Sequence, residues 1–285
     1  MAQDPLTIAT FALLAAAVAA LWAPPRRLWI AFLILASGCG LASGWLSWPG
    51  LVAMAVLAAA SWQSQRGDTP RRRLAGSLVV VALGGALMLH VVPGFAGWLV
   101  APDVRLSPGS QSFSLFLNFD KPLIGLFLLA AGGSLLTTLE GWRRILPWTL
   151  GMLAVAIAVV LVGTFLLGYA SWDPKLPALF ALWAPRNLLF TCVAEEAYFR
   201  LLIQGGLERA LGRFRWGARA AWVVASVLFG VAHVGGGWQF VLLATLAGGA
   251  YGLAYQRTRA IEASILVHLG LNSLHFLLFN YPAAA

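Results

Sequence analysis

Uninterrupted apolar segments constrain this 285-residue chain more than any other feature of its sequence. Residues 6–22, for example, form a run (LTIATFALLAAAVAALW) that contains no charged side chain. Overall, 60% of the residues are hydrophobic and 10% are charged, against about 45–50% and about 25% in ordinary soluble domains. So few charges cannot cover the surface of a water-soluble protein of this size, and disorder requires the opposite composition. The sequence therefore predicts an integral membrane protein.

The apolar segments are separated by polar or turn-forming stretches, which predicts an all-α, polytopic helical bundle. A helix needs about 20 apolar residues to cross a bilayer. By this measure we expect about ten transmembrane helices, within a range of about eight to ten. The short third segment is the weakest of these spans, and as a re-entrant segment it would change the orientation of the N-terminus. The long polar segment 93–122 is predicted to be a connector. The expected spans are 6–22, 28–47, 51–63, 74–92, 123–139, 145–169, 178–211, 220–236, 238–255 and 261–280.

Arginine is concentrated in alternate loops. Under the positive-inside rule these loops are cytoplasmic, and ten spans then place both termini outside. The net charge of +9 therefore indicates orientation in a lipid bilayer, and no nucleic-acid partner is expected. The preference for Arg over Lys, with much Ala, is typical of a GC-rich genome, so we expect a bacterial cytoplasmic (inner) membrane. The remaining loops have only Arg105, Lys121 and Lys175 as basic residues. The arginine-rich loops contain Arg26 and Arg27, Arg66–Arg73, Arg143 and Arg144, Arg209–Arg219, and Arg257 and Arg259.

A few ionisable residues lie inside apolar segments instead of in loops. Glu195, Glu196 and Arg200 belong to the seventh segment, His233 to the eighth and His268 to the tenth. A charged side chain at the centre of a membrane helix costs at least about 2.5–3.5 kcal/mol, so such groups face the bundle interior and pair with one another. Glu196 and Arg200 are four residues apart and can pair on one helix. Glu195 is rotated by about 100° around the helix axis from Glu196 and is predicted to face a different partner.

These residue types are suited to hydrolysis. A carboxylate in an apolar site can take a proton from water, and a histidine can position that water or relay the proton. A second histidine with Asn272, which lies one turn after His268, can donate hydrogen bonds to an oxyanion. No nucleophilic Ser or Cys is required. Cys39 and Cys192 both lie in apolar runs and are predicted to be buried small hydrophobic residues.

Three motifs in the last third of the chain carry a resemblance to a known family. They are EEAYFR at 195–200 (EExxxR), FGVAH at 229–233 (FxxxH) and HLGLN at 268–272 (HxxxN). In this order and on late apolar helices, they resemble the CAAX prenyl protease and bacteriocin-processing (CPBP, or Abi) family of intramembrane glutamic endopeptidases. One departure is Leu201, where many members have Gly. The resemblance divides the chain into N-terminal helices of unrecognised role (1–177) and a CPBP-like catalytic bundle (178–285).

The resemblance implies a role for each catalytic residue. Glu195 would be the general base that activates water, and His233 would assist it. His268 and Asn272 would stabilise the tetrahedral oxyanion. The substrate would be a membrane-embedded or lipid-anchored protein or peptide.

Three further residues would support the catalytic groups in a member of this family. Glu196 with Arg200 would hold the helix in place, and Phe229 would pack beneath His233.

Alternative interpretations use the same residues. In a zinc-dependent form of the protease, Glu195, His233 and His268 would hold the metal with an open fourth position. The sequence lacks an HExxH helix, so we favour the metal-free glutamate mechanism and expect no cofactor, with zinc as the alternative. A proton-coupled transporter would use these groups as a relay, but the inverted repeats with broken helices typical of that class are not visible in the sequence. A non-catalytic membrane scaffold would keep the motifs for structure alone.

Overall fold

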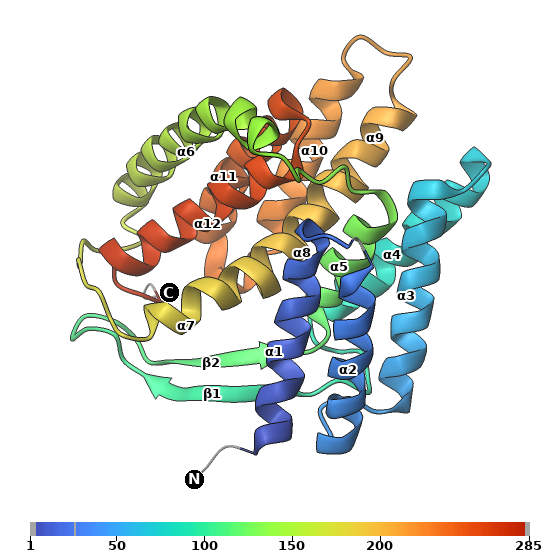
Figure 1. The fold of residues 1–285 in the computed structure, drawn as a ribbon. Helices are drawn as coiled ribbons and strands as arrows, with labels where there is room; N and C mark the ends of the chain where they lie inside the picture. The colour runs from blue at the N-terminus through green and yellow to red at the C-terminus, as the bar shows by residue number, and fades with distance from the viewer. Residues whose placement is uncertain (1–3, 26, 283–285) are drawn as a thin grey trace. The chain divides into compact units, whose positions relative to one another are not determined.

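The computed structural model describes residues 4–25 and 27–282, and these are predominantly helical (Figure 1). This confirms the predicted all-α class, to which the structure adds one two-stranded sheet. The chain folds into two compact units that alternate along the sequence. Unit 1 comprises the residues up to Val100, Phe116–Thr137 and Arg186–Tyr198, and unit 2 comprises Ala101–Leu115, Thr138–Pro185 and the residues from Phe199 onwards. Arg26, part of the first arginine-rich loop, lies outside the described residues.

Unit 1 consists mainly of short apolar helices that pack in pairs. Helix α1 packs against α2, α3 against α4, and α5 against both α3 and α8. Small residues allow the close approach, as is usual where helices pack in lipid. A Cβ atom on Gly76 of α4 would lie 2.6 Å from the Ser64 backbone nitrogen on α3. The elements are α1 (Pro5–Ala19), η1 (Ala20–Trp22), α2 (Leu28–Ser43), α3 (Trp48–Arg66), α4 (Pro70–Met88), α5 (Lys121–Gly132), η2 (Asn187–Cys192) and α8 (Val193–Glu196).

Local sequence signals fix where several of these helices start and stop. The Asp4 carboxylate caps α1 by accepting a hydrogen bond from the Leu6 backbone nitrogen at 3.2 Å. Thr69 caps α4 in the same way, and a proline follows each of these caps. Helix α2 ends at Ser43, and the Gly44 that follows has a φ of 80°, a conformation that favours a residue without a side chain.

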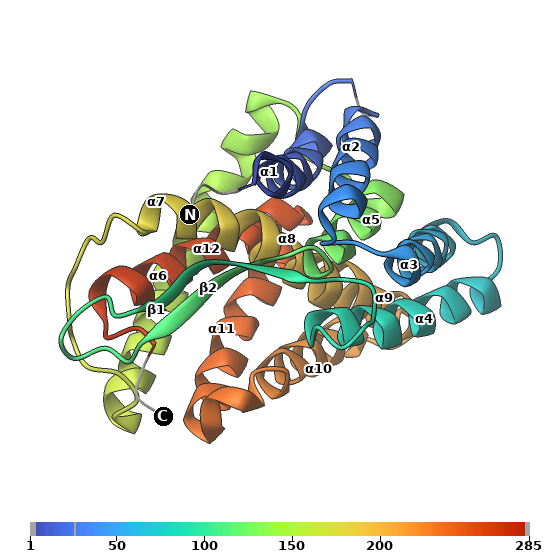
Figure 2. The ribbon, with the colours of Figure 1, turned by 90° about the horizontal axis from the view of Figure 1, so that it is seen from below.

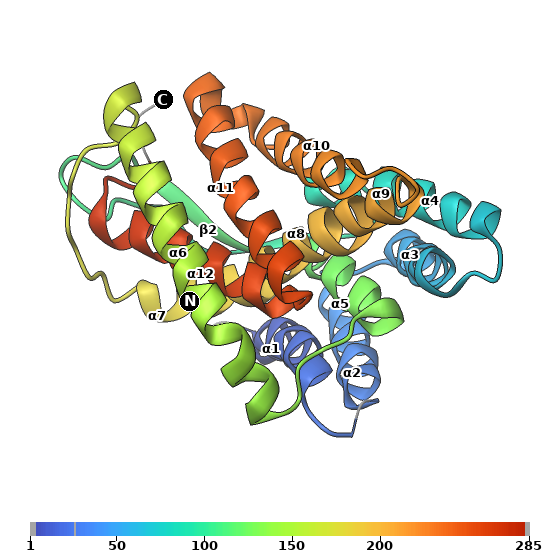
Figure 3. The same cartoon turned by 90° about the horizontal axis from the view of Figure 1, so that it is seen from above.

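Unit 2 is built around helix α11. This helix packs against α6, α10 and α12, and Figure 3 shows it between α6 and α10. Helix α12 also packs against α6. The elements that lie in unit 2 or begin or end in it are α6 (Leu139–Leu167), α7 (Phe180–Arg186), η3 (Ala197–Gln204), α9 (Gly205–Ala210), α10 (Gly217–Val231), η4 (Val234–Gly236), α11 (Gly237–Thr258) and α12 (Ile261–Leu278).

Within residues 4–25 and 27–282, three helical segments are long and apolar enough to cross a membrane, namely Pro5–Trp22, Leu139–Leu167 and Ile261–Leu278. A fourth span is added if α10 and α11, which are bent by 53° at their junction, are taken together. The predicted count of about ten spans is therefore not confirmed. One reason for the difference is that an apolar run in the sequence can be longer than the helix that forms within it. The run 123–139 is interrupted because α5 ends at Gly132.

Helix α6 has the surface expected of a helix in lipid. Only 11% of its most apolar stretch is buried, although the stretch has a mean hydropathy of 2.7. A continuous apolar surface of this kind is unfavourable in water. With the composition of the chain, it identifies an integral membrane protein. The large apolar side chains exposed along α6 include Leu146, Trp148, Leu150, Val155, Val159, Val162, Phe165 and Leu166.

The predicted connector 93–122 contains the two strands of the sheet, β1 (Gly97–Val104) and β2 (Phe113–Asn118) (Figure 2). Side chains alternate between buried and exposed in the middle of β2, where Leu115 and Leu117 are buried and Phe116 is exposed. Within unit 2, Leu115 packs in a cluster with Trp183 of α7 and Phe276 of α12, whose rings stack at 4.3 Å. This short strand anchors the polar segment to an apolar core.

A polar clasp in unit 2 holds the loop after α6 against the end of α12. The Asp173 backbone nitrogen donates to the Leu278 carbonyl at 2.8 Å, and the Lys175 nitrogen donates to the Leu277 carbonyl at 2.7 Å. The Asp173 carboxylate accepts hydrogen bonds from the Ser107 hydroxyl and from Lys175 Nζ. The hydrogen bond from Ser107 holds the pKa of the Asp173 carboxyl below its ordinary value, and Lys175 acts in the same direction.

Asp173→Asn should therefore destabilise the protein in a pH-dependent way. Because the folded pKa of Asp173 lies below the unfolded one, the carboxylate stabilises the fold above the ordinary Asp pKa of about 3.9 and ceases to do so as the pH falls through the folded value. We expect a loss of about 1 kcal/mol at pH 7, where charged hydrogen bonds are replaced by neutral ones. Thermal unfolding in detergent at pH 7 and in acid should show the difference shrinking with falling pH. The exposed Asp103→Asn change is the control, and equal effects of both variants would contradict the clasp.

Candidate functional site

The three motifs lie on three helical regions. EEAYFR runs from the end of α8 into the π-helix η3. FGVAH begins in the last turn of α10 and places His233 in the turn after the helix ends at Val231, and HLGLN lies in the middle of α12. Wide π turns flank the two glutamates on both sides, in η2 and in η3. Such turns are rare and occur frequently at functional sites. Unit 1 contains Glu195 and Glu196, and unit 2 contains Arg200, Phe229, His233, His268 and Asn272.

Phe229 is the centre of the unit 2 residues. Its ring lies 4.7 Å from the imidazole of His233 and 5.6 Å from that of His268, measured between ring centroids. The guanidinium carbon of Arg200 lies 5.5 Å from the same ring, at cation–π distance. Phe229 itself is 2% exposed. The structure thus brings residues of all three motifs together around one aromatic side chain.

The hydrogen bond of His233 fixes which ring nitrogen carries the proton in the neutral imidazole. Nδ1 lies 2.7 Å from the Phe229 carbonyl oxygen. Because a carbonyl only accepts, Nδ1 is the donor, and Nε2 is the nitrogen that can accept a proton or a hydrogen bond. His233 also contacts Phe240 of α11, with the centroids 5.4 Å apart. The ring is therefore held from two sides.

His268 is buried and stacked on a tyrosine. The Tyr251 ring on α11 lies 4.6 Å from the imidazole at an interplanar angle of 16°. Both residues are almost fully buried, whereas Asn272, one turn further along α12, is half-buried. Tyr251 was not predicted to belong to the site, because a tyrosine in an apolar run without a charged or polar motif gives no signal of a site.

Arg200 is completely buried beside the backbone of α11. Gly252 makes this possible, because a Cβ atom there would lie 2.9 Å from Arg200 Nη1 and 2.8 Å from Gln204 Oε1. Gln204 Nε2 also donates to the Gly252 carbonyl at 3.2 Å. Gly252 therefore provides the space in which the motif arginine fits.

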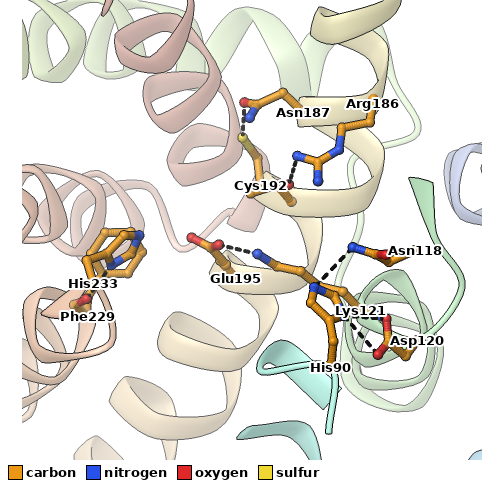
Figure 4. A network of polar contacts seen from close by, with 11 residues as sticks. His90, Asn118, Asp120, Lys121, Arg186, Asn187, Cys192, Glu195, Phe229 and His233 are labelled. Carbon is orange, nitrogen blue, oxygen red and sulfur yellow. Dashed lines mark hydrogen bonds and ion pairs between the residues drawn. The ribbon is translucent and has the colours of Figure 1, made fainter. Parts of the chain in front are cut away.

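In unit 1, Glu195 forms an ion pair that was not predicted from the sequence. Lys121 Nζ, from the first residue of α5, lies 2.6 Å from Glu195 Oε1 (Figure 4). Glu195 is 6% exposed and Glu196 is fully buried. Lys121 was predicted to lie in a loop, because it belongs to the polar segment 93–122. It is 74 residues from Glu195 and outside the motifs, so the sequence did not connect the two residues. The only signal in the sequence was its place directly before an apolar segment.

The residues that directly precede Glu195 in unit 1, including Cys192, are held by side-chain hydrogen bonds. The Cys192 thiol donates to Asn187 Oδ1 at 3.2 Å, and Arg186 binds Thr191 Oγ1 at 3.0 Å (Figure 4). Cys192 is buried, and both it and Cys39 are free thiols. Across the described residues, no three His, Cys, Asp or Glu side chains are grouped as metal ligands.

Comparison with known proteins gives one match. A family model described as type II CAAX prenyl endopeptidase Rce1-like matches residues 177–274. No curated protein and no solved structure matches the chain. The matched segment contains all three motifs, and the match confirms the resemblance predicted from them. Residues 177–274 of this membrane protein are thus similar to the Rce1-like type II CAAX prenyl endopeptidases.

Proposed function

We propose that the protein is an intramembrane endopeptidase that hydrolyses a peptide bond of a membrane-associated protein or peptide. The observation that carries the proposal is the Rce1-like match over a segment in which five of the seven motif residues are buried and His233 and Asn272 are half-buried. The Phe229 ring touches both motif histidines, and Lys121 binds the motif glutamate. Polar groups buried at such a cost in an apolar protein are expected to serve a function.

In the proposed reaction, Glu195 and His233 act on the same water molecule. His233 orients the water through Nε2, and the Glu195 carboxylate removes a proton as the water oxygen attacks the carbonyl carbon of the substrate. His268 and Asn272 donate hydrogen bonds to the oxyanion of the tetrahedral intermediate. When the C–N bond breaks, the proton held by Glu195 passes to the leaving amine nitrogen. The Nδ1 hydrogen bond of His233 supports this role, because it leaves Nε2 as the accepting nitrogen.

The remaining motif residues are proposed to position the catalytic groups. Phe229 would keep the two imidazoles in place through its ring contacts. Arg200, buried against Gly252, would anchor the helix that carries Glu195, together with Glu196.

The zinc-dependent alternative fits the observed contacts less well. Zinc would have to bind the Glu195 carboxylate, whose Oε1 is held by the Lys121 ammonium group at 2.6 Å. A lysine ammonium and a divalent cation repel each other and compete for the same oxygen. We therefore keep the metal-free mechanism as the proposal.

The substrate class and the location are also proposals. The family name refers to prenylated CAAX proteins, and we propose a membrane-embedded or lipid-anchored protein or peptide as the substrate. We further propose a bacterial cytoplasmic membrane with the arginine-rich loops on the cytoplasmic side. The positive-inside rule supports this orientation.

Glu195→Gln should abolish cleavage, because the amide cannot accept the proton from water. We expect the rate to fall by about 10²–10⁴-fold, the usual contribution of a general base. Mass spectrometry of membrane proteins from cells with the wild type or the variant will identify the cut ends and provide a peptide for rate measurements. The exposed Glu140→Gln change is the matched control and should leave cleavage intact. Identical cut ends with the wild type and E195Q would exclude the proposed function.

Removal of metal ions should leave the activity unchanged. In the proposed mechanism, water is activated by the carboxylate alone, so incubation of the purified protein with a chelator should not slow cleavage of the identified peptide. A loss of activity that zinc restores would instead support the metal form with Glu195, His233 and His268 as ligands.

A further inference from the structure

We propose that Lys121 is a positioning residue for Glu195 and that its ammonium group holds the catalytic carboxylate in one orientation. This inference rests on the proposed function and adds a residue from outside the Rce1-like segment. Lys121 is the first residue of α5, and Glu195 lies in α8, which packs against α5 within unit 1.

The ion pair is short and shielded from solvent. Lys121 Nζ lies 2.6 Å from Glu195 Oε1, and the two side chains are 17% and 8% exposed. Salt screens buried pairs much less than surface pairs. Removing one partner of a buried pair leaves an uncompensated charge, which is strongly unfavourable. The pair is thus a persistent contact and differs from the exposed pair of Arg72 with Asp68, whose side chains are 64% and 65% exposed.

A close approach of two helices brings Lys121 to Glu195. Gly125 lies one turn after Lys121 on α5, and a Cβ atom on it would lie 2.9 Å from Val193 Cγ1 and 3.0 Å from the Ala194 Cα atom. Val193 and Ala194 directly precede Glu195 on α8. The missing side chain of Gly125 therefore lets the lysine at the start of α5 reach the carboxylate.

A chain of hydrogen bonds fixes the start of α5 (Figure 4). The Asp120 carboxylate accepts from the Lys121 backbone nitrogen at 2.8 Å. His90 Nδ1 lies 2.8 Å from the same carboxylate, and Asn118 Nδ2 lies 3.1 Å from His90 Nε2. With Asn118 as the donor, Nε2 accepts and Nδ1 carries the proton that is donated to Asp120. These contacts place the Lys121 backbone, and the aliphatic chain then extends to Glu195.

The ion pair with Lys121 restricts the rotation of the Glu195 carboxylate. The last torsion of a glutamate side chain is broad, so a carboxylate without a fixed contact samples many orientations. With Oε1 bound to Nζ, the ion pair restricts this rotation and keeps the carboxylate in one orientation. Catalysis is sensitive to such positioning, because a displacement of about 1 Å at a reacting group can cost about 10²-fold in rate.

Lysine labelling in detergent tests the contact independently of activity. The chain contains two lysines, Lys121 and Lys175, so an amine-acetylating reagent followed by peptide mass spectrometry reports on each separately. In Glu195→Gln, Lys121 should be acetylated several-fold faster than in the wild type, because its anionic partner is gone. Lys175, whose contacts are to Asp173 and Phe279, serves as the internal control and should not change. Equal Lys121 rates in the two proteins would overturn the inference.

Cleavage kinetics test the positioning role, with the peptide identified by comparing the wild type and E195Q as the probe. Lys121→Met should lower kcat by about 10–100-fold with little change in KM, because substrate contacts are retained while the carboxylate is misplaced. Lys121→Arg keeps the charge and should restore most of the rate. Arg72→Met is the matched control. It removes a side chain of the same charge from the exposed Arg72–Asp68 ion pair of unit 1 and should leave kcat unchanged.

The outcomes separate this inference from the proposed function. If wild type and E195Q produce the same cut ends, the proposed function fails and the positioning role fails with it. If E195Q abolishes cleavage but K121M retains the wild-type kcat, only the role of Lys121 is overturned. If the ion pair were merely structural, K121M and K121R would both have a lower unfolding temperature, and arginine would not restore kcat. That result would also overturn the positioning role of Lys121.

Discussion

The free-energy cost of burying a charged side chain in an apolar protein constrains the structure of both units. A chain with 10% charged residues can bury a carboxylate or a guanidinium only where the fold supplies a specific partner. In unit 1, the Lys121 ammonium group fulfils this requirement for Glu195. In unit 2, the Phe229 ring lies against the guanidinium group of Arg200. Each partner comes from an element distant in sequence, so helix packing and the positions of the ionisable groups depend on each other.

Glycine makes these contacts geometrically possible. Helices in lipid gain little from the hydrophobic effect, and small residues let their backbones approach. Gly125 allows α5 to meet α8, and Gly252 leaves room for Arg200 and Gln204 beside α11. In both cases a side chain at the glycine would collide with the element that carries the motif. The glycines therefore act on the candidate site without touching a reacting group.

The sequence revealed the candidate residues because ionisable groups stand out in apolar runs. Glu195, His233 and His268 were each identified in this way, and the all-α class followed from the same runs. Lys121 and Tyr251 were missed, since one precedes an apolar segment and the other is an aromatic residue within one. The count of about ten spans is not confirmed, because hydropathy does not show where a helix stops, and α5 stops at Gly132. The strands β1 and β2 were missed because alternation over so few residues is a weak signal.

In the proposed mechanism, Glu195 activates water to cleave a peptide bond directly. Single-turnover cleavage of the identified peptide in H₂¹⁸O, with the enzyme in excess, tests this most directly. We expect one ¹⁸O atom in the new carboxyl end and none in the Glu195 carboxylate, because the carboxylate only transfers a proton. An ¹⁸O atom in Glu195 would show that it attacks the substrate as a nucleophile and would contradict direct attack by water.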